Sequence, residues 1–342
     1  MSDVATWKVH GPVKTLRTES ATWDSNQQDW QPSQFFRLAS FRPDGTVSTS
    51  EHHNPDGSIA HLRWLYNEPT QLAEQDFWNN DDPIHKTLYF YDEAGRHIRT
   101  VRESPDGTQT DTEACTYDAT GKRTKVSFLS LYGPNVSYDI EGTDHSYGAH
   151  GANTMATTYD EHDLPAKVIF QDANRTHVTT VIFTRDSAGR ILTEEMHIGG
   201  ASMLVNLNNA PPEEREKLTP ILEQLFGKFS GTTYTYDTEG RLLERTTRMG
   251  NLEEDRTTYR YDGHNEPIEE ITERKSREAN IGEDGAMHYT SERLHIQHNR
   301  LEYRYDTHGN WTEKIVSIRP EQNPDFQRSN IERRAITYHT SH

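Results

Sequence analysis

The sequence predicts an all-β fold: an antiparallel meander of β-hairpins that forms a curled or partly coiled sheet, with one or two short helical insertions. The main observation is a recurring Tyr-Asp-x-x-Gly phrase, in which aspartate and glycine occupy positions that a tight turn favours. A second observation is the alternation of aromatic residues before these turns, and a third is the regular spacing of the turns. The complete phrases begin at Tyr91, Tyr117, Tyr236 and Tyr305.

Each residue of the phrase has a physical role in a hairpin. Tyrosine favours a pleated, half-buried strand, and the aspartate side chain accepts hydrogen bonds from backbone N–H groups two residues further on. The glycine adopts the positive φ that restores the strand twist after a type I turn. In imperfect copies of the phrase, Asp163 and Asn265 stand in place of this glycine, which is possible because Asp and Asn tolerate the conformation at some cost. The predicted turn residues are Asp92, Gly95, Asp118, Gly121, Asp186, Gly189, Asp237, Gly240, Asp262, Asn265, Asp306 and Gly309.

Aromatic residues alternate before several of the turns. Examples are the pairs Tyr89/Tyr91 and Tyr234/Tyr236. Alternation places both members of a pair on one face of a strand. The segments before the turns are therefore predicted to be strands, and the polar-apolar segments after them to be the return strands.

The spacing of the turns indicates one repeating unit. The turn aspartates stand at positions 92, 118, 160, 186, 237, 262 and 306, so the successive gaps are 26, 42, 26, 51, 25 and 44 residues. A basic period of about 25 residues is typical of arrays in which each unit stacks on its neighbours. Pro-Asp-Gly turns ending at Gly45, Gly57 and Gly107 fill the remaining space. Two hairpin turns in each unit predict a meander.

Parts of the chain without the turn phrase are expected to be a cap and insertions. The N-terminal part has aromatic residues but no turn phrase, and the end of a repeat sheet must be covered. Thr70–Trp78 is compatible with a short helix or an irregular excursion. Asn208–Gly227 has capping and acidic residues at its start and an apolar stripe at helical spacing, which predicts a helix on a sheet face or a partner-binding lid. The expected segments are a cap over 1–40, a repeat array over 41–342 and insertions at about 67–83, 131–153 and 200–228.

The insertion at 131–153 is the candidate binding loop. It is rich in Gly, Tyr, His and Asp, and long loops on a rigid array tend to carry binding residues. Carboxylate and imidazole groups are competent metal ligands. Polar loop residues gathered by chance are the ordinary explanation, so we predict no metal. The candidate binding residues are Tyr132, Asp144, His145, Tyr147 and His150.

The charge balance disfavours two classes of partner. The chain carries 54 acidic and 36 basic residues, a formal net charge of −18. Such an acidic field repels nucleic acid and anionic membranes, and no stretch approaches the roughly 20 apolar residues of a membrane span. We therefore expect no nucleic-acid partner and no membrane insertion. The N-terminus lacks the basic start and apolar core of a secretory signal, which predicts a cytoplasmic protein, with non-classical export as the alternative.

Composition limits the core but argues against disorder. Only 32% of the residues are hydrophobic, which a repeat sheet tolerates because each strand buries one face and leaves the other in water. Disordered chains are poor in aromatic residues, whereas this chain has 6 Trp, 16 Tyr and 11 Phe in periodic places. The single Cys115 excludes an internal disulfide, and a free cysteine is usually a small buried hydrophobe.

The chain resembles the RHS/YD-repeat family, whose signature is a Tyr-Asp-x-x-Gly-Arg-Leu core in units of similar length. The match is best at Tyr236–Leu242 and Tyr91–Arg96, and it covers most of the chain from Phe41 to Tyr338. The resemblance implies a hollow β-shell or an extracellular adhesive scaffold of YD/RHS-type repeats. The chain departs from the family in showing neither a toxin-like module after the last repeat nor the aspartate-bearing self-cleavage motif that ends many family shells.

Three functions are compatible with these observations. The first is a noncatalytic repeat scaffold that binds a protein or glycan partner through sheet-face aromatics and inserted loops, because aromatic rings offer flat apolar area with polar tips. The second, implied by the resemblance alone, is a partial shell that wraps or chaperones a separately encoded toxin-like protein. The third is an acid/base hydrolase acting on glycans, with paired acids at Glu253–Asp255 or Glu269–Glu270. Solvated strand faces are the ordinary explanation for these acids, so we predict no catalytic residue and no cofactor, and the oligomeric state stays open.

Overall fold

The computed structural model describes residues 7–31, 36–68, 71–129, 135–139, 146–150, 154–171, 177–198, 213, 230–250, 253–281, 287–320 and 323–340. The chain forms two compact units. Unit 1 comprises Met1–Asp111, Tyr261–Glu269 and His298–His342, and unit 2 comprises Thr112–Arg260 and Glu270–Gln297.

The regular elements of the described residues are strands. The first are β1 (Val13–Asp24), β2 (Asp29–Trp30), β3 (Phe36–Phe41), β4 (Val47–His53), β5 (Ile59–Glu68), β6 (Gln71–Asn79), β7 (Asp82–Tyr91), β8 (His97–Glu103) and β9 (Gln109–Tyr117). Next come β10 (Arg123–Leu129), β11 (Asn135–Asp139), β12 (Ser146–His150), β13 (Thr154–Tyr159), β14 (Pro165–Gln171), β15 (His177–Arg185) and β16 (Ile191–Ile198). The last are β17 (Ser230–Tyr236), β18 (Leu242–Met249), β19 (Glu253–Tyr261), β20 (Pro267–Ile281), β21 (Met287–Tyr305), β22 (Trp311–Arg319) and β23 (Gln327–Tyr338).

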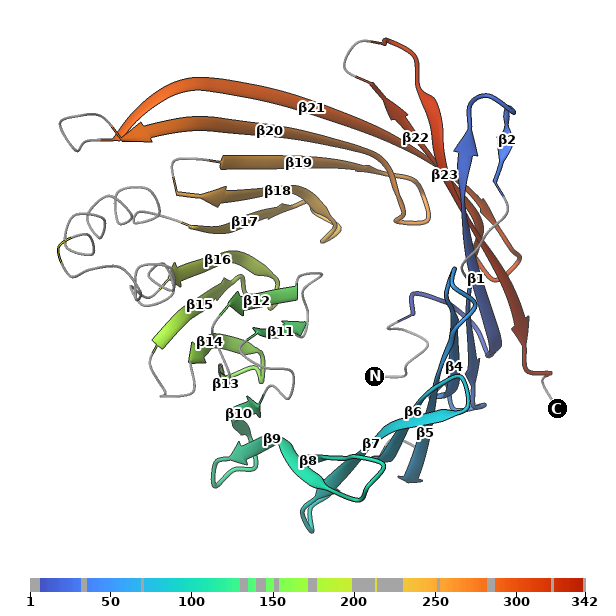
Figure 1. The fold of residues 1–342 in the computed structure, drawn as a ribbon, viewed down its shortest axis with the longest axis vertical. Helices are drawn as coiled ribbons and strands as arrows, with labels where there is room; N and C mark the ends of the chain where they lie inside the picture. Colours follow the sequence, from blue (N-terminus) through green and yellow to red (C-terminus); the bar gives the residue numbers. More distant parts are fainter. Residues whose placement is uncertain are drawn as a thin grey trace. The chain divides into compact units, whose positions relative to one another are not determined.

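Most strands of unit 1 pair antiparallel with their neighbours in the sequence. The ladder runs from β3 to β8 without a crossover, and β21, β22 and β23 pair in the same way. Strand β1 differs, because it pairs with β3 on one side and with β23 on the other. Figure 1 shows β1 beside β23, and their register runs from Val13↔Tyr338 to Thr22↔Asn330.

This pairing shows that the predicted meander is wrong. In an open meander the first and last strands are edges, whose backbone N–H and C=O groups lack partners on one side. Here β1, which lies in the expected cap over residues 1–40, has a partner strand on each side. Backbone groups of the first and last long strands thus satisfy each other, and the local turn pattern carries no information about a pairing across 300 residues.

The predicted helical insertions are also not supported. The segment Thr70–Trp78 was expected to be a short helix or an irregular excursion, but β6 occupies Gln71–Asn79 and pairs with both β5 and β7. Pairing on both sides satisfies the backbone N–H and C=O groups of alternate residues on either side, so nearly the whole strand is hydrogen-bonded, and this tertiary gain outweighs a weak helical preference. The expected helix at Asn208–Gly227 lies outside the described residues, except for Glu213. Apart from that isolated residue, every regular element in the described stretches is a strand.

Unit 2 contains a second antiparallel ladder. Its strands pair in the order β9, β10, β13, β14, β15, β16, β17, β18 and β19. Strands β11 and β12 pair with each other as a separate two-stranded sheet. Figure 1 shows β13 to β18 following one another in sequence order. Sequential pairing of this kind is what short hairpin turns impose, because each turn returns the chain beside the strand that it has just left.

The turns have the hydrogen bonds that the recurring phrase predicts. At the first complete phrase, the Gly95 N–H donates to the Asp92 carbonyl at 2.9 Å, and the Asp92 N–H donates to the Arg96 carbonyl at 3.0 Å. The Asp92 Oδ1 atom accepts from the N–H groups of Ala94 and Arg96, and Gly95 has a φ of 76°. The same pair of backbone bonds recurs at the turns that begin at Asp118, Asp160, Asp186, Asp237, Asp262 and Asp306.

Arginine after the glycine completes the turn in three copies. In each, the arginine Nε donates to the second carboxylate oxygen of the turn aspartate at 2.7 Å, in the pairs Arg96–Asp92, Arg190–Asp186 and Arg241–Asp237. The hydrogen bond from Arg96 lowers the pKa of the Asp92 carboxyl. This bond gives a physical reason for the Gly-Arg step that follows the Tyr-Asp pair.

Tyrosine hydroxyls join one turn to a later strand where no arginine is present. The Tyr305 hydroxyl donates to Asp262 Oδ2 at 2.6 Å, and its ring stacks on His264 with centroids 3.9 Å apart. Tyr338 hydrogen-bonds Asp306 in the same way. In the arginine-containing turns the aspartate oxygen is already occupied, and Tyr236 instead donates to the Ile191 carbonyl at 2.8 Å. The tyrosine of the phrase therefore couples neighbouring repeats.

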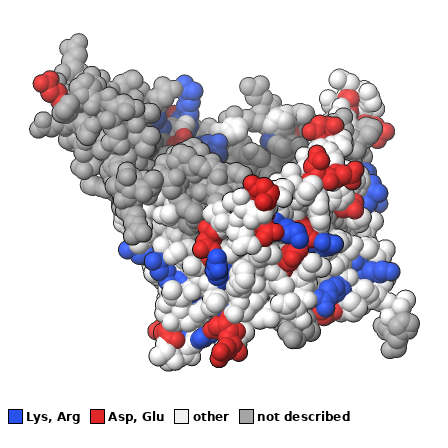
Figure 2. All heavy atoms as spheres, turned by 60° about the horizontal axis from the view of Figure 1, so that its bottom comes forward, with Lys and Arg blue, Asp and Glu red and all other residues white. Residues whose placement is uncertain are grey.

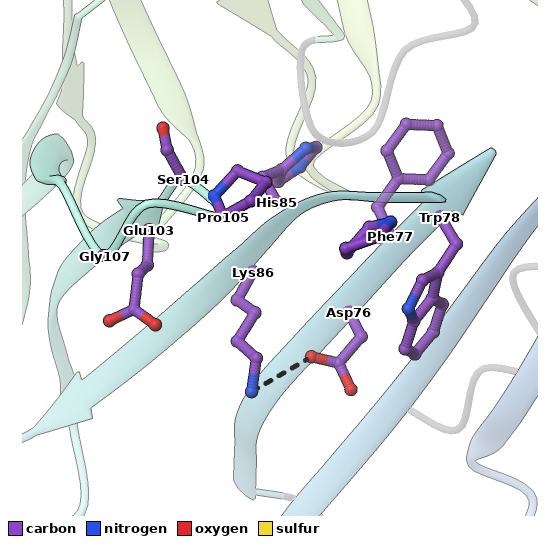
Figure 3. Close-up of a pocket in the computed structure, with 10 residues that line it drawn as sticks. Asp76, Phe77, Trp78, His85, Lys86, Glu103, Ser104, Pro105 and Gly107 are labelled. Carbon is purple, nitrogen blue, oxygen red and sulfur yellow. Dashed lines mark ion pairs between the residues drawn. The ribbon is translucent and has the colours of Figure 1, made fainter. Parts of the chain in front are cut away.

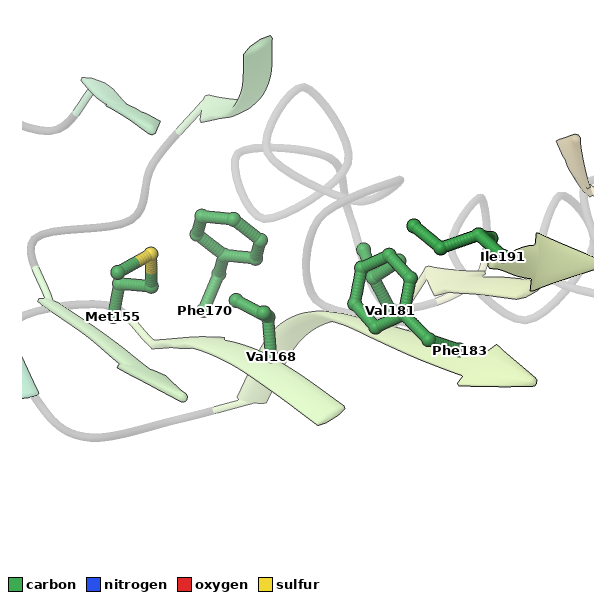
Figure 4. Close-up of a cluster of buried hydrophobic side chains, with 6 residues drawn as sticks. All are labelled: Met155, Val168, Phe170, Val181, Phe183 and Ile191. Carbon is green, nitrogen blue, oxygen red and sulfur yellow. The ribbon is translucent and has the colours of Figure 1, made fainter. Parts of the chain in front are cut away.

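Each unit has a small apolar cluster. In unit 1 the cluster joins the N-terminal strands, and its buried members are Val9, Val13, Leu16, Ala39, Phe41 and Val47. In unit 2 the cluster lies across β13 to β16, as Figure 4 shows, and its buried members are Met155, Val168, Phe170, Val181, Phe183 and Ile191. Burial of these side chains gives each ladder one apolar patch, in keeping with the low apolar content of the sequence. Within the described residues, no helix has the length and apolar character needed to cross a membrane.

Candidate functional site

A row of alternating charges crosses four strands of unit 1. Arg63 on β5 is opposite Asp76 on β6, which is opposite Lys86 on β7, which in turn is opposite Glu103 on β8. Neighbouring strands in a sheet lie about 4.8 Å apart. The row therefore presents hydrogen-bond donors and acceptors alternately at a regular spacing, with each charge beside an opposite one.

Asp76 is the buried member of this row. Its side chain is 2% exposed, and its Oδ2 atom accepts hydrogen bonds from Arg63, including one from Nε at 2.9 Å. The Oδ1 atom has no hydrogen-bond partner among the described residues, and Lys86 Nζ lies 3.8 Å from it. Lys86 itself is half-exposed and donates to Glu74 at 3.1 Å. A buried carboxylate oxygen without a donor is costly, which makes Asp76 a position where a donor from a ligand gains free energy.

Trp78 lies beside this row. Figure 3 shows the side chains of Asp76, Trp78 and Lys86 on one side of the strands, and those of Phe77 and His85 on the other. The Arg63 guanidinium carbon lies 5.2 Å from the centroid of the Trp78 ring. Arg63 also precedes Trp64, which packs against the apolar cluster of unit 1. Since consecutive strand residues point to opposite faces, the Trp78 side is the face of β5 that points away from that cluster.

Two hollows adjoin Trp78. One has a volume of about 390 Å³ and is lined by Glu51, His61, Arg63 and Trp78, together with residues of the β6–β7 turn. The other has a volume of about 280 Å³, and Figure 3 shows the residues that line it, among them Asp76, Trp78 and Lys86. These volumes lie near the lower end of the range for small-ligand sites. We call the six residues Glu51, His61, Arg63, Asp76, Trp78 and Lys86 the Trp78 surface.

The turn at one end of the Trp78 surface is fixed by an asparagine. Asn80 has a φ of 52°, its N–H donates to the Ile59 carbonyl at 2.7 Å, and its Oδ1 accepts from the Ile59 N–H at 2.9 Å. The left-handed conformation that Asn tolerates thus closes the β6–β7 hairpin and binds it to β5. This arrangement holds the strand that carries Trp78 in a defined position.

Histidines lie near the aromatic residues on both faces of these strands, with His61 on the Trp78 side and His85 on the Phe77 side. His61 Nδ1 lies 3.7 Å from Glu51 Oε1, and His53 Nε2 lies 3.2 Å from Glu51 Oε2. On the opposite face, His85 packs against Phe77 with ring centroids 5.3 Å apart. Burial, together with the nearby Arg102 charge, lowers the pKa of His85 and favours its neutral form. The region therefore combines aromatic rings, neutral polar groups and paired charges.

The binding residues predicted in the inserted loop are not tested by the structure. Tyr132, Asp144 and His145 lie outside the described residues. Tyr147 and His150 belong to β12, where their backbones pair with Tyr138 and Asn135 of β11. The loop site thus stays a prediction.

Sequence reasoning missed the Trp78 surface because Thr70–Trp78 was expected to be a short helix or an irregular excursion rather than a strand. On a helix, Asp76 and Trp78 are about 200° apart, whereas on a strand they share a face. The available signal was the alternation of Glu74, Asp76 and Trp78, together with the tight Asn80–Asp81 turn that follows.

Three of the acids considered for a hydrolase, Glu254, Asp255 and Glu269, have basic partners on the sheet. Glu254 accepts from Arg248 at 2.8 Å, and this hydrogen bond lowers the pKa of the Glu254 carboxyl. Asp255 binds Arg274 at 2.9 Å, and Glu269 lies 2.6 Å from His298 Nε2. These contacts give the acids cross-strand structural partners.

One carboxyl in unit 2 has a strongly altered pKa. The Glu194 side chain is 1% exposed, and burial raises its pKa from 4.5 to about 7, partly offset by the Tyr234 hydroxyl and the Arg245 charge. Across the ladder Glu194 is opposite Phe183 and Thr232 rather than another carboxyl. This isolation differs from the pair of facing acids that glycoside hydrolysis requires.

Cys115 has the properties of a structural thiol. Burial and the neighbouring Glu113 carboxylate raise its pKa to about 11. A nucleophilic cysteine needs a lowered pKa, because the thiolate is the reactive form. The side chain is half-buried, and its Sγ atom lies 3.9 Å from Glu113 Oε1.

Acidic and basic side chains are interspersed on the surface. Figure 2 shows one face on which Lys and Arg lie among Asp and Glu. Cross-strand ion pairs account for part of this pattern, for example Arg256–Glu244 at 2.7 Å and Arg277–Glu292 at 3.0 Å. These pairs neutralise part of the charge locally, and the net charge of −18 is the excess of acidic over basic residues in the whole chain.

Comparison with known proteins gives no assignment. No family model matches the chain, and no curated protein matches it. A porin-like protein from Bacteroides uniformis is 10% identical, with 96% of this chain and 99% of that chain covered and a TM-score of 0.35. The Tc holotoxin pore of Photorhabdus luminescens is 13% identical, with 91% of this chain covered and a TM-score of 0.25. The TcdB2-TccC3-Cdc42 structure is 12% identical, with 91% of this chain covered and a TM-score of 0.23. This chain covers 18% of each of these two Tc toxin chains. Similarities at this level assign no function.

Proposed function

We propose that this chain is a noncatalytic repeat scaffold that binds a protein or glycan partner, and that the Trp78 surface is its binding site. The observation that carries the proposal is the combination of a partly exposed indole with a buried carboxylate oxygen that lacks a donor, at Trp78 and Asp76. Binding sites typically combine apolar and aromatic area with a few placed polar groups. A catalytic role is not part of the proposal, because no group on this surface is assigned as nucleophile or general acid.

The rigidity of the surroundings supports this role. β5, β6 and β7 pair on both sides, and the Asn80 turn fixes one end of the hairpin. The Arg63–Asp76 hydrogen bonds hold the guanidinium near the Trp78 ring. A preorganised surface loses little conformational entropy when a partner binds, so more of the contact energy appears as affinity.

We also propose that the chain is a short array of YD-type repeats of the RHS class. The recurring hydrogen bonds at Asp92, Asp118, Asp186, Asp237 and Asp306 support this assignment. The arginine that follows the glycine in three turns adds to it, since that residue belongs to the family signature. The proposal rests on the repeated phrase and its turns rather than on overall structural similarity.

Binding to arrays of glycans and of synthetic peptides tests the scaffold proposal. We expect ligands that are retained by the wild-type protein to bind Trp78→Ala about fivefold more weakly, because loss of an aromatic contact costs on the order of 1 kcal/mol. Trp30→Ala is the matched control, since Trp30 is partly buried and packs on Trp23 with centroids 5.0 Å apart, on other strands. Binding that is unchanged in Trp78→Ala, or equally weakened in Trp30→Ala, contradicts the proposal.

A further inference from the structure

The chemistry of the Trp78 surface distinguishes between classes of ligand. Among its six residues, Arg63 and Lys86 are basic, Glu51 and Asp76 are acidic, and Trp78 and His61 carry no fixed charge. The charges are neighbours as well as balanced, because Asp76 lies opposite both Arg63 and Lys86 in the ladder. Within these six residues the charges cancel, so the surface supplies no excess of basic groups to attract a strongly anionic ligand.

The extended rim of the surface is acidic. Glu103 continues the row beyond Lys86, and Asp81 lines the larger hollow. The chain as a whole has a net charge of −18. An anionic ligand, such as a uronic acid polymer, therefore meets repulsion from the rim and gains no excess of basic groups at the centre.

A polyhydroxyl ligand matches the alternating row. Each hydroxyl is both a donor and an acceptor, so one sugar can donate to a carboxylate and accept from a neighbouring guanidinium or ammonium. The Asp76 Oδ1 atom requires a donor, because it has no hydrogen-bond partner among the described residues. Lys86 Nζ is 3.8 Å from this oxygen and its side chain is 49% exposed, so after a small movement of the lysine a hydroxyl can donate to Oδ1 and accept from the ammonium group.

The two hollows indicate a chain rather than a single sugar. They have volumes of about 390 Å³ and about 280 Å³, and Trp78 lines both. The smaller hollow is also lined by Phe77 and His85, and the two hollows share Trp78, so a ligand that extends from one into the other contacts the indole. The flat apolar face of a sugar ring can pack on an aromatic ring at such a crossing, while its hydroxyls remain at the edge for polar contacts.

We infer that the ligand of the Trp78 surface is an uncharged oligosaccharide, which crosses Trp78 and donates a hydroxyl hydrogen bond to Asp76 Oδ1. This inference rests on the proposed binding function and deepens it. The neutral character follows from the balanced charges, and the oligomeric character follows from the paired hollows. A protein partner is the competing occupant, and the experiment separates it from a glycan.

Calorimetric titration with matched hexasaccharides tests the inference. The neutral probes are β-1,4-glucan, α-1,4-glucan and β-1,4-linked N-acetylglucosamine hexamers, and the acidic probe is hexagalacturonate. We expect at least one neutral probe to bind, and the acidic probe to bind at least about tenfold more weakly than it. Affinity for the neutral probe should be unchanged between about 0.05 and 0.5 M NaCl, because salt screens only charge–charge attraction.

Two substitutions connect that binding to the site. Asp76→Asn and Lys86→Met should each weaken binding of the neutral probe. The first should lower its affinity by about tenfold, since a hydrogen bond to a charged group is lost. Asp255→Asn is the control for the first, because Asp255 pairs with Arg274 at 2.9 Å on the sheet of unit 2. Lys86→Met keeps the test valid if Asp76→Asn does not fold, because the Lys86 side chain is 49% exposed.

The possible results separate the inference from the scaffold proposal. Tighter binding of hexagalacturonate that depends on Trp78 overturns the neutral-glycan inference and leaves the binding surface in place. Trp78-dependent binding of peptides, with no hexasaccharide bound, also overturns the inference while the scaffold proposal stands. If no glycan and no peptide binds in a Trp78-dependent manner, both fail.

Discussion

Replacing the buried Glu194 by glutamine should make the protein less sensitive to pH. Burial raises the pKa of this carboxyl from 4.5 to about 7. Between these values the folded chain holds a proton that the unfolded chain has released, so the free energy of unfolding falls as pH rises. Below the unfolded-state pKa the Glu194 carboxyl is protonated in both states and its stabilising effect relative to the ionised form is fully present. Above the folded-state pKa the buried carboxyl is ionised, and that stabilisation is fully lost. A shift of this size corresponds to about 3 kcal/mol.

The effect is measured as a difference between variants. Urea unfolding of wild type and Glu194→Gln, followed by tryptophan fluorescence from pH 4 to pH 8, gives the difference in unfolding free energy at each pH. We expect this difference to shift by about 3 kcal/mol in favour of Glu194→Gln across the range, because the amide does not ionise. The absolute difference at low pH includes the altered packing and hydrogen bonding of the amide, whereas the change with pH does not.

A neighbouring residue supplies the control. Glu195 follows on the same strand, and its side chain is 48% exposed. Consecutive strand residues point to opposite faces, so Glu195→Gln changes the same chemical group in water. A difference between wild type and Glu194→Gln that is constant from pH 4 to pH 8, or one that Glu195→Gln reproduces, refutes the reasoning.

Substitutions at three further positions test the packing of the ladders and turns by denaturant unfolding. Gly231→Ala should destabilise the protein by about 1–3 kcal/mol or more, because a Cβ atom there would lie 2.0 Å from the Glu194 carbonyl oxygen; an unchanged midpoint would show that the backbones are not so close. Gly240→Ala should cost about 1–2 kcal/mol, because φ at this turn is 85°, and Gly240→Asn should cost less; equal costs would contradict the positive-φ argument. Asn310→Ala should cost about 2–3 kcal/mol, because the buried Asn310 side chain bonds the His10 N–H at 2.6 Å, the His10 carbonyl at 2.9 Å and the Tyr338 hydroxyl at 2.8 Å; a loss below about 0.5 kcal/mol would show that this junction of distant segments is dispensable.

The positions of the turns could be predicted because their interactions are local. The Asp92 carboxylate bonds N–H groups two and four residues further on, and Gly95 adopts its φ of 76° within the same few residues. Asn265 replaces glycine with a φ of 65°, as its tolerance of this conformation predicts. Interactions of this range depend on the residues of one turn and on no other part of the chain.

The Trp78 surface could not be predicted in the same way. Its members come from β4, β5, β6 and β7, and their proximity depends on the register that places Arg63 opposite Asp76 and Asp76 opposite Lys86. A shift of one residue would send alternate side chains to the other face. The sequence contains these charges but does not state their register. Interpreting Thr70–Trp78 as a short helix or an irregular excursion also removed the strand alternation on which the surface depends.

The sequence by itself determined that this chain consists of strands reversed by aspartate and glycine at regular intervals, because a turn is stabilised within five residues. Only the tertiary structure decided that β6 is a strand, that Glu194 is buried, and that β1 pairs with β23. Each of these depends on backbone groups and surfaces from distant segments. A pairing between Val13 and Tyr338 is selected by the hydrogen bonds that both strands otherwise lack, and no local pattern in either strand specifies its partner.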